Sequence, residues 1–85
     1  MTKNNQLTVR DFINLIVTYG DDYTGWEVND YTDTTDYDWC INNTSSFVRI
    51  NQFLDKRGDR IVTHIAIRGD AYPDRCIIAD VNPDE

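Results

Sequence analysis

The stretch LTVRDFINLIVTYGDDYTGWEVND, residues 7–30, decides the fold because its hydrophobic period changes part-way along. From Val9 to Ile16 the apolar side chains recur at i, i+3, i+4 and i+7, which is the spacing of one helix face. After Gly20 the period falls to two, and residues 26–29 alternate as a half-buried strand does. The stretch therefore predicts a helix followed by a sheet, which is an α+β fold.

The predicted helix has a clear start and a clear end. Thr8 precedes it and Asp11 stands three positions later, which makes a capping box with Asp in place of the more usual Glu. Gly20 supplies a typical stop signal. We therefore predict an amphipathic helix over residues 9–19.

Two strands are predicted next, over residues 26–29 and 36–41, because apolar and polar side chains alternate in both. The connecting residues 30–35 contain only Asp, Thr and Tyr, which suits a loop. The simplest arrangement is a hairpin with an apolar inner face and an acidic outer face.

The next apolar segment, residues 47–54, fits two structures. We favour a strand, although its apolar residues also share one helical face, with Ser46 as a cap and Gly58 as a stop. Residues 55–58 have the form of a type I turn closed by a glycine in the left-handed region, which is a usual hairpin connection. This turn leads into the β-rich residues that follow.

The remaining apolar segments predict a central strand over residues 60–67 and a last strand over residues 76–81. Together these elements predict one N-terminal helix packed on a four- or five-stranded, mostly antiparallel sheet in meander order. The 85 residues make a single domain, in which residues 1–6 and 82–85 are expected to be disordered.

The acidic residues are concentrated in one part of the chain. No lysine or arginine occurs between Arg10 and Arg49, so the segment 11–48 holds eight acids and no base, within a total net charge of −7. Such a chain lacks the positive surface that contacts with phosphates require, so we expect no direct nucleic-acid binding. Solubility tolerates mixed signs and does not explain the exclusion of bases, because a single-sign field costs self-repulsion.

The sequence contains no catalytic signature. His64 is the single histidine, and its place in the run VTHIAI predicts a half-buried strand residue. Cys40 forms a thiol dyad with His64 only if the strands bring the two together. The acids of residues 30–38 lack the spacing of an EF-hand, and the glycines form no phosphate-binding loop. We therefore expect no enzyme, no metal site and no cofactor.

The cellular location follows from two expectations. Nothing resembles a secretion leader, and the longest apolar run is far shorter than the roughly 20 residues that span a membrane. We therefore expect a cytoplasmic protein that does not bind membranes. In that compartment Cys40 and Cys76 are expected to be reduced thiols.

The segment LTVRDFINLIVTYGDD followed by WEVND resembles the start of many small phage and plasmid accessory proteins. In that pattern a short capped helix leads into a Tyr- and Asp-rich turn and then a strand, although the proline that often stands in the turn is missing here. In size and acidity the chain is also similar to anti-CRISPR and anti-restriction proteins. The resemblance implies a mobile-element origin and carries no active-site motif.

The leading hypothesis is a small phage-type inhibitor. Its acidic face partly mimics nucleic acid and occupies the basic groove of a host nucleic-acid-binding defence protein, with aromatic residues as anchors. Acids at i and i+2 on a strand lie about 6.6 Å apart, against about 3.4 Å per charge along one DNA strand, so only a short site can be imitated. The predicted partner-binding residues are Asp21, Asp22, Tyr23, Glu27, Asp30, Tyr31, Asp33, Asp36 and Asp38.

The alternative hypothesis is a non-catalytic accessory or assembly module. In that case the acidic face only solvates the surface, and the sheet or the helix mediates self-association. The sequence leaves the oligomeric state open.

Overall fold

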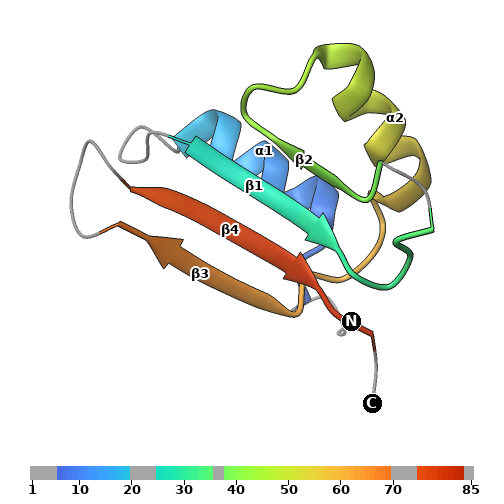
Figure 1. Ribbon diagram of the computed structural model, residues 1–85. Coiled ribbons are helices and arrows are strands. Elements are labelled where there is room, and N and C mark those ends of the chain that lie inside the picture. The colour runs from blue at the N-terminus through green and yellow to red at the C-terminus, as the bar shows by residue number, and fades with distance from the viewer. Residues whose placement is uncertain (1–5, 20–24, 36–37, 70–74, 84–85) are drawn as a thin grey trace.

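The computed structural model describes residues 6–19, 25–35, 38–69 and 75–83. These residues form two helices and a four-stranded sheet, so the α+β class is confirmed (Figure 1). In chain order the elements are α1 (Val9–Tyr19), β1 (Gly25–Asp30), β2 (Cys40–Asn42), α2 (Phe47–Arg57), β3 (His64–Arg68) and β4 (Cys76–Val81).

The sheet is mixed, and its strand order is β2-β1-β4-β3. The two central strands, β1 and β4, run parallel, whereas the pairs β1·β2 and β3·β4 are antiparallel. The prediction of a mostly antiparallel meander is therefore wrong. A parallel pair needs a crossover of a dozen or more residues, and β2, α2 and β3 together supply it.

The predicted hairpin between the first two strands is confirmed. Val28 pairs with Ile41 in antiparallel register, and Asp30 N donates a hydrogen bond of 2.8 Å to the Trp39 carbonyl. The second strand is shorter than predicted, because regular pairing covers only Cys40–Asn42. The hairpin places the loop 31–35 at the same end of the sheet as the end of β4, where Tyr31 N bonds the Val81 carbonyl at 2.8 Å.

Helix α1 starts where the sequence indicates. Asp11 N donates to Thr8 Oγ1 at 3.1 Å, and Thr8 N donates to Asp11 Oδ2 at 3.2 Å, so both halves of the capping box form. The helix spans Val9–Tyr19, as predicted. The stop expected at Gly20 lies outside the described residues.

The prediction of a strand over residues 47–54 is wrong, because this segment is the first two turns of α2. Ser46 caps the helix by accepting a hydrogen bond of 3.1 Å from Arg49 N, and Phe53 is buried in the core. The capping serine and the burial of one helical face outweigh the β-forming preference of the residue types. Because the helix continues to Arg57, the predicted hairpin turn at 55–58 does not exist.

Gly58 ends α2 for a reason other than the one predicted. Its φ is −63°, an ordinary helical value rather than a left-handed one, and its N–H bonds the Leu54 carbonyl at 2.8 Å. A Cβ at this position would lie 2.5 Å from the Leu54 oxygen and 2.6 Å from Arg10 Nη2. The glycine is therefore needed for close packing between the end of α2 and α1.

Strand β3 is an edge strand, and the prediction of a central strand over 60–67 is wrong. All five of its residues are exposed. Ile61 and Val62 lie before it and join the chain to the start of α1, through a bridge from Ile61 to Thr8 and a hydrogen bond of 2.8 Å from Val62 N to the Leu7 carbonyl. β4 takes the central place because it pairs with both β1 and β3.

The buried apolar residues of both helices and three strands form one cluster. Its members are Val9, Phe12, Ile13, Val28, Ile41, Phe53, Ala79 and Val81. In the view of Figure 1, α1 passes behind β1, so the viewer faces the side of the sheet that is turned away from this core. No helix in the described part of the chain is long and apolar enough to cross a membrane.

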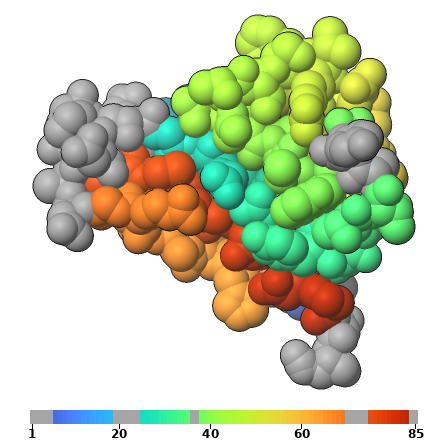
Figure 2. Space-filling view, viewed as in Figure 1, coloured from blue at the N-terminus to red at the C-terminus, as the bar shows by residue number. Residues whose placement is uncertain are grey.

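We call the side of the sheet that is turned away from the core the open face. Side chains alternate along each strand, so its residues are those between the core positions. On the three longer strands they include Glu27, Asn29, His64, Ala66, Ile78 and Asp80. Figure 2 shows atoms of β1, β3 and β4 at the surface on this side.

Candidate binding face

Asp30 is buried, contrary to the prediction that it belongs to an exposed binding surface. It is the last residue of β1 and has no exposed surface. Its Oδ2 accepts hydrogen bonds from Arg57, at 2.9 Å, and from Arg60. Its Oδ1 accepts from the backbone and the hydroxyl of Thr32. Asp30 therefore fastens the sheet to the end of α2 and is not available to a partner.

The surroundings of Asp30 fix it in the ionised form. Burial alone raises its pKa, but the hydrogen bonds from Thr32, Arg57 and Arg60 outweigh burial, and the pKa is lowered. Arg57 has 1% exposure, also donates to the Asp33 carbonyl at 2.8 Å, and lies 5.6 Å from the centre of the Phe53 ring. An ionised carboxylate held by two arginines is a structural group and is unsuited to general-base catalysis.

Two further predicted acids lie beside bases of α2. Asp33 Oδ2 is 3.7 Å from Lys56 Nζ, and Asp38 Oδ1 is 3.6 Å from Arg49 Nη2. Hydrogen bonds from the Thr35 hydroxyl and backbone lower the pKa of Asp33. Asp30, Asp33 and Asp38 of the base-free segment 11–48 therefore pair with bases of α2, and Asp30 pairs with Arg60 as well. This pairing of acids with bases was not predicted from the sequence, because residues 47–54 were predicted to be a strand.

Tyr31 and Trp39 form an aromatic pair at one end of the open face. Their ring centroids are 5.3 Å apart with planes inclined by 44°, and Tyr31 is 43% exposed. Burial raises the pKa of the Tyr31 phenol, and the negative charges of Asp80 and Glu27 raise it further. The phenol therefore lies within reach of the electrostatic field of both carboxylates.

The two carboxylates are joined by an amide. Asn29 Nδ2 donates to Glu27 Oε2 at 2.9 Å and to Asp80 Oδ1 at 3.2 Å, and Asn29 itself is only 5% exposed. Glu27 was predicted as a site residue but Asp80 was not. The one sequence feature that could have identified Asp80 was its alternation with Ala79 and Val81 in the last predicted strand. That alternation did not reveal which strand lies beside it.

The predicted site residues thus separate into several places. Glu27 and Tyr31 lie together on the open face, where Trp39 and Asp80 join them, and we call these four residues the aromatic–acidic face. Asp33 and Asp38 lie beside α2, and Asp30 is buried. The predicted residues outside the described part of the chain are Asp21, Asp22, Tyr23 and Asp36.

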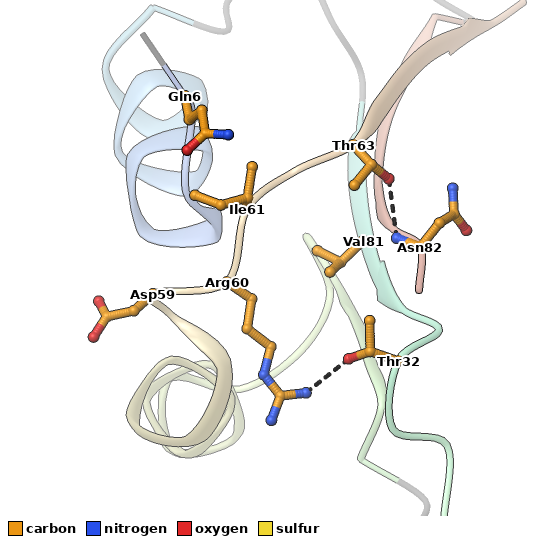
Figure 3. A pocket seen from close by; sticks show the side chains of 8 residues that line it. All are labelled: Gln6, Thr32, Asp59, Arg60, Ile61, Thr63, Val81 and Asn82. Atoms are coloured by element: carbon orange, nitrogen blue, oxygen red, sulfur yellow. Dashed lines mark hydrogen bonds between the residues drawn. The ribbon is translucent and has the colours of Figure 1, made fainter. Parts of the chain in front are cut away.

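A pocket of about 410 Å³ lies between the start of α1, the 59–63 connection and the end of β4 (Figure 3). Its polar groups already bond one another: Arg60 donates to the Thr32 hydroxyl at 2.9 Å, and Thr63 Oγ1 accepts from Asn82 N at 2.9 Å. Asn82 N is thereby hydrogen-bonded to the residue that precedes β3. The Thr63 hydroxyl lies 3.0 Å from His64 Nδ1, but it donates its proton to the Asp80 carbonyl at 3.1 Å.

The thiol dyad of Cys40 and His64 is excluded by the strand order. Cys40 lies on β2 and His64 on β3, which are the two opposite edges of the sheet, about 14 Å apart at 4.8 Å per strand. His64 is exposed rather than half-buried, and its Nδ1 contacts the Thr63 hydroxyl and the Asn82 amide. Both cysteines are free thiols. Among the described residues, no group of three His, Cys, Asp or Glu side chains could hold a metal ion.

Comparison of the chain with protein-family models, curated proteins and solved structures finds no match.

Proposed function

We propose that this protein is a non-catalytic binding protein that docks its aromatic–acidic face on a basic surface of another protein. The observation that carries the proposal is the half-exposed Tyr31, whose ring packs against Trp39 at an inclination of 44°, at the end of the open face that carries the carboxylates of Glu27 and Asp80. Aromatic side chains are frequent energetic anchors of interfaces. An arginine or lysine of a partner can lie over the rings and pair with a carboxylate at the same time.

The partner we propose is the basic nucleic-acid groove of a host defence protein, which the chain inhibits in the manner of a small phage-encoded protein. The net charge of −7 supports attraction to such a groove. Asp30, Asp33 and Asp38 already pair with bases of this chain, so they are less suited to contact a basic partner. Docking through a few arginines or lysines is better supported than imitation of a run of phosphates by the 30–38 loop.

The test uses a short arginine-rich peptide as the probe and calorimetric titration as the measurement. Tyr31→Ala and Glu27→Gln are expected to weaken binding by about tenfold each, or about 1.4 kcal/mol. Asp55→Asn is the matched control, because it removes one exposed charge from α2, away from this face. Equal loss in Asp55→Asn and Glu27→Gln would show attraction by net charge alone and would overturn the proposed face.

A capture experiment from host lysate then tests the class of partner. The wild-type chain is expected to enrich nucleic-acid-binding proteins at low salt and to release them as salt rises, because screening weakens a charge-driven interface. The double variant Tyr31→Ala/Glu27→Gln is expected to lose that enrichment. Capture of the same proteins by both chains would contradict the proposal.

A second candidate function is an assembly module that associates with itself. The specific observation in its favour is the fully exposed edge strand β3 with its two large apolar side chains.

A further inference from the structure

The outer edge of β3 carries exposed apolar side chains that continue the core. Ile65 and Ile67 are 51% and 48% exposed. Ile65 pairs with Ala79, which is fully buried, and Ile67 pairs with Ile77, which packs against the core. Because paired residues share a face of the sheet, both isoleucines point to the side where the helices lie. The core therefore extends to this edge, where both isoleucines remain about half exposed.

The flank of α1 that faces this edge is apolar as well. Val17 lines a groove with Phe47 of α2, so Val17 marks the α2 side of α1. Helix positions advance by about 100° per residue, which places Leu15 on the opposite flank. α2 contacts β2 at one edge of the sheet, and β3 is the other edge, so Leu15 lies on the β3 side. Leu15 is 47% exposed.

The edge lacks the usual protection against strand pairing. Natural edge strands are commonly blocked by prolines, bulges or inward-pointing charges. The sequence of β3, HIAIR, contains no proline, glycine or acid, and its charged residue, Arg68, stands at the end. Without Arg68, the net charge of the chain would be −8 rather than −7. β3 is therefore an edge where two copies of an acidic chain can meet without bringing acids of the strand together.

We propose that a second copy of this chain pairs with β3 in antiparallel register about a two-fold axis at Ala66. The strand is self-complementary in that arrangement: Ile65 lies opposite Ile67 of the second copy, and the two Ala66 residues face each other. The two α1 helices then approach over the joined strands. Leu15, Ile65 and Ile67 of both copies form one apolar cluster that covers what the monomer leaves exposed.

This inference rests on the second candidate function, self-association through β3, and uses a different surface from the aromatic–acidic face. The axis is perpendicular to the sheet, so the two copies form an eight-stranded sheet with both aromatic–acidic faces on the same side. A partner with two basic sites would then meet a bivalent surface, in which linkage raises the effective affinity. The contact is short compared with a standard interface of about 1,600 Å², so a reversible dimer is expected.

Sedimentation equilibrium of the full chain over a concentration series tests the dimer. The average mass is expected to rise from 9.9 kDa towards twice that value, and added salt should strengthen association because the two acidic copies repel each other less. Ile65→Lys is expected to remain monomeric, whereas Val48→Lys, a still more exposed apolar position on α2, should associate like the wild type. A wild-type chain that stays monomeric at millimolar concentration would overturn the proposal.

Cross-linking tests the register in chains whose own cysteines are replaced, Cys40→Ala and Cys76→Ala. Ala66→Cys should form a disulfide between copies on mild oxidation, because facing Cα atoms in an antiparallel pair lie about 4.5 to 5.5 Å apart, within disulfide range. Arg68→Cys is the control, since the two-fold axis places its two copies about 14 Å apart along the strands. Cross-linking of Arg68→Cys in preference to Ala66→Cys would overturn the proposed pairing.

Discussion

Arg57 Nη1 donates a hydrogen bond of 2.9 Å to Asp30 Oδ2 at a place where neither side chain is exposed to solvent. The two residues are 27 positions apart in the chain and join the end of β1 to the end of α2. Asp30 neutralises Arg57 and is also bonded by Arg60, so its loss removes the carboxylate that both arginines share. This pair is a main attachment of α2 to the sheet.

Removal of one partner of the buried pair is expected to destabilise the fold strongly. Asp30→Ala should lower the free energy of unfolding by about 3–5 kcal/mol, because Arg57 stays buried and charged. Urea denaturation followed by circular dichroism measures the change. Asp33→Ala is the comparison, since its ion pair with Lys56 is partly exposed to solvent and such pairs contribute little to stability. Equal losses in the two variants would contradict the structural role of Asp30.

The same carboxylate makes stability depend on pH in the acid range. The pKa of Asp30 is lowered on folding, so its contribution is complete above the unfolded pKa, about 3.9, and is lost as the pH falls through the lower folded pKa. Denaturation midpoints of the wild type should therefore drop steeply below about pH 4. Asp30→Asn should be less stable at neutral pH and show a shallower drop. Parallel pH profiles for the two chains would refute this assignment.

Gly58→Ala is expected to cost stability although the glycine has ordinary helical φ. The new Cβ would meet the Leu54 carbonyl at 2.5 Å, and overpacking of this kind costs about 1–3 kcal/mol. Gly25→Ala is the matched change, and its closest contact is the Asn43 side chain at 2.8 Å, which can move. Thermal unfolding should show the larger loss for Gly58→Ala, and the reverse order would contradict the packing described at the end of α2.

Ser46→Ala should lower stability by about 1 kcal/mol, because α2 would lose the side chain that accepts from Arg49 N. Asn51→Ala is the control: it lies exposed in the middle of the same helix, where alanine has the better helix propensity. Chemical denaturation should therefore show opposite or unequal effects of the two substitutions. A neutral Ser46→Ala would mean that the cap adds nothing to α2.

The parts of the fold that were predicted correctly depend on neighbours in sequence. The box of Thr8 and Asp11 fixed the start of α1, and alternation on both sides of the 30–35 loop identified the hairpin. The β1·β4 pair could not be predicted in this way, since its bonded positions are about fifty residues apart, as the contact of Asn29 with Asp80 shows. Alternation predicts a strand but does not name its neighbour.

The same limit explains which residues of the candidate site were predicted from the sequence and which were missed. Glu27 and Tyr31 were identified because acids and aromatic residues cluster around them in sequence, whereas Asp80 reaches the same face only through the parallel pairing. Asp30 was misassigned because its burial depends on Arg57, which turns inward only when residues 47–57 form a helix. Whether such an acid is buried or exposed thus depends on where the arginines lie in space, which the composition of the segment does not show.

The parallel pairing of β1 with β4 also determines the order in which the fold can be completed. The strand between β1 and β3 is residues 76–81, which follow both of them in the chain. Before it is synthesised, β1 can pair only with the short β2, and β3 lacks a partner among the described strands. The helices and the first hairpin can therefore form early, but the sheet closes in one step when its final strand enters at the centre.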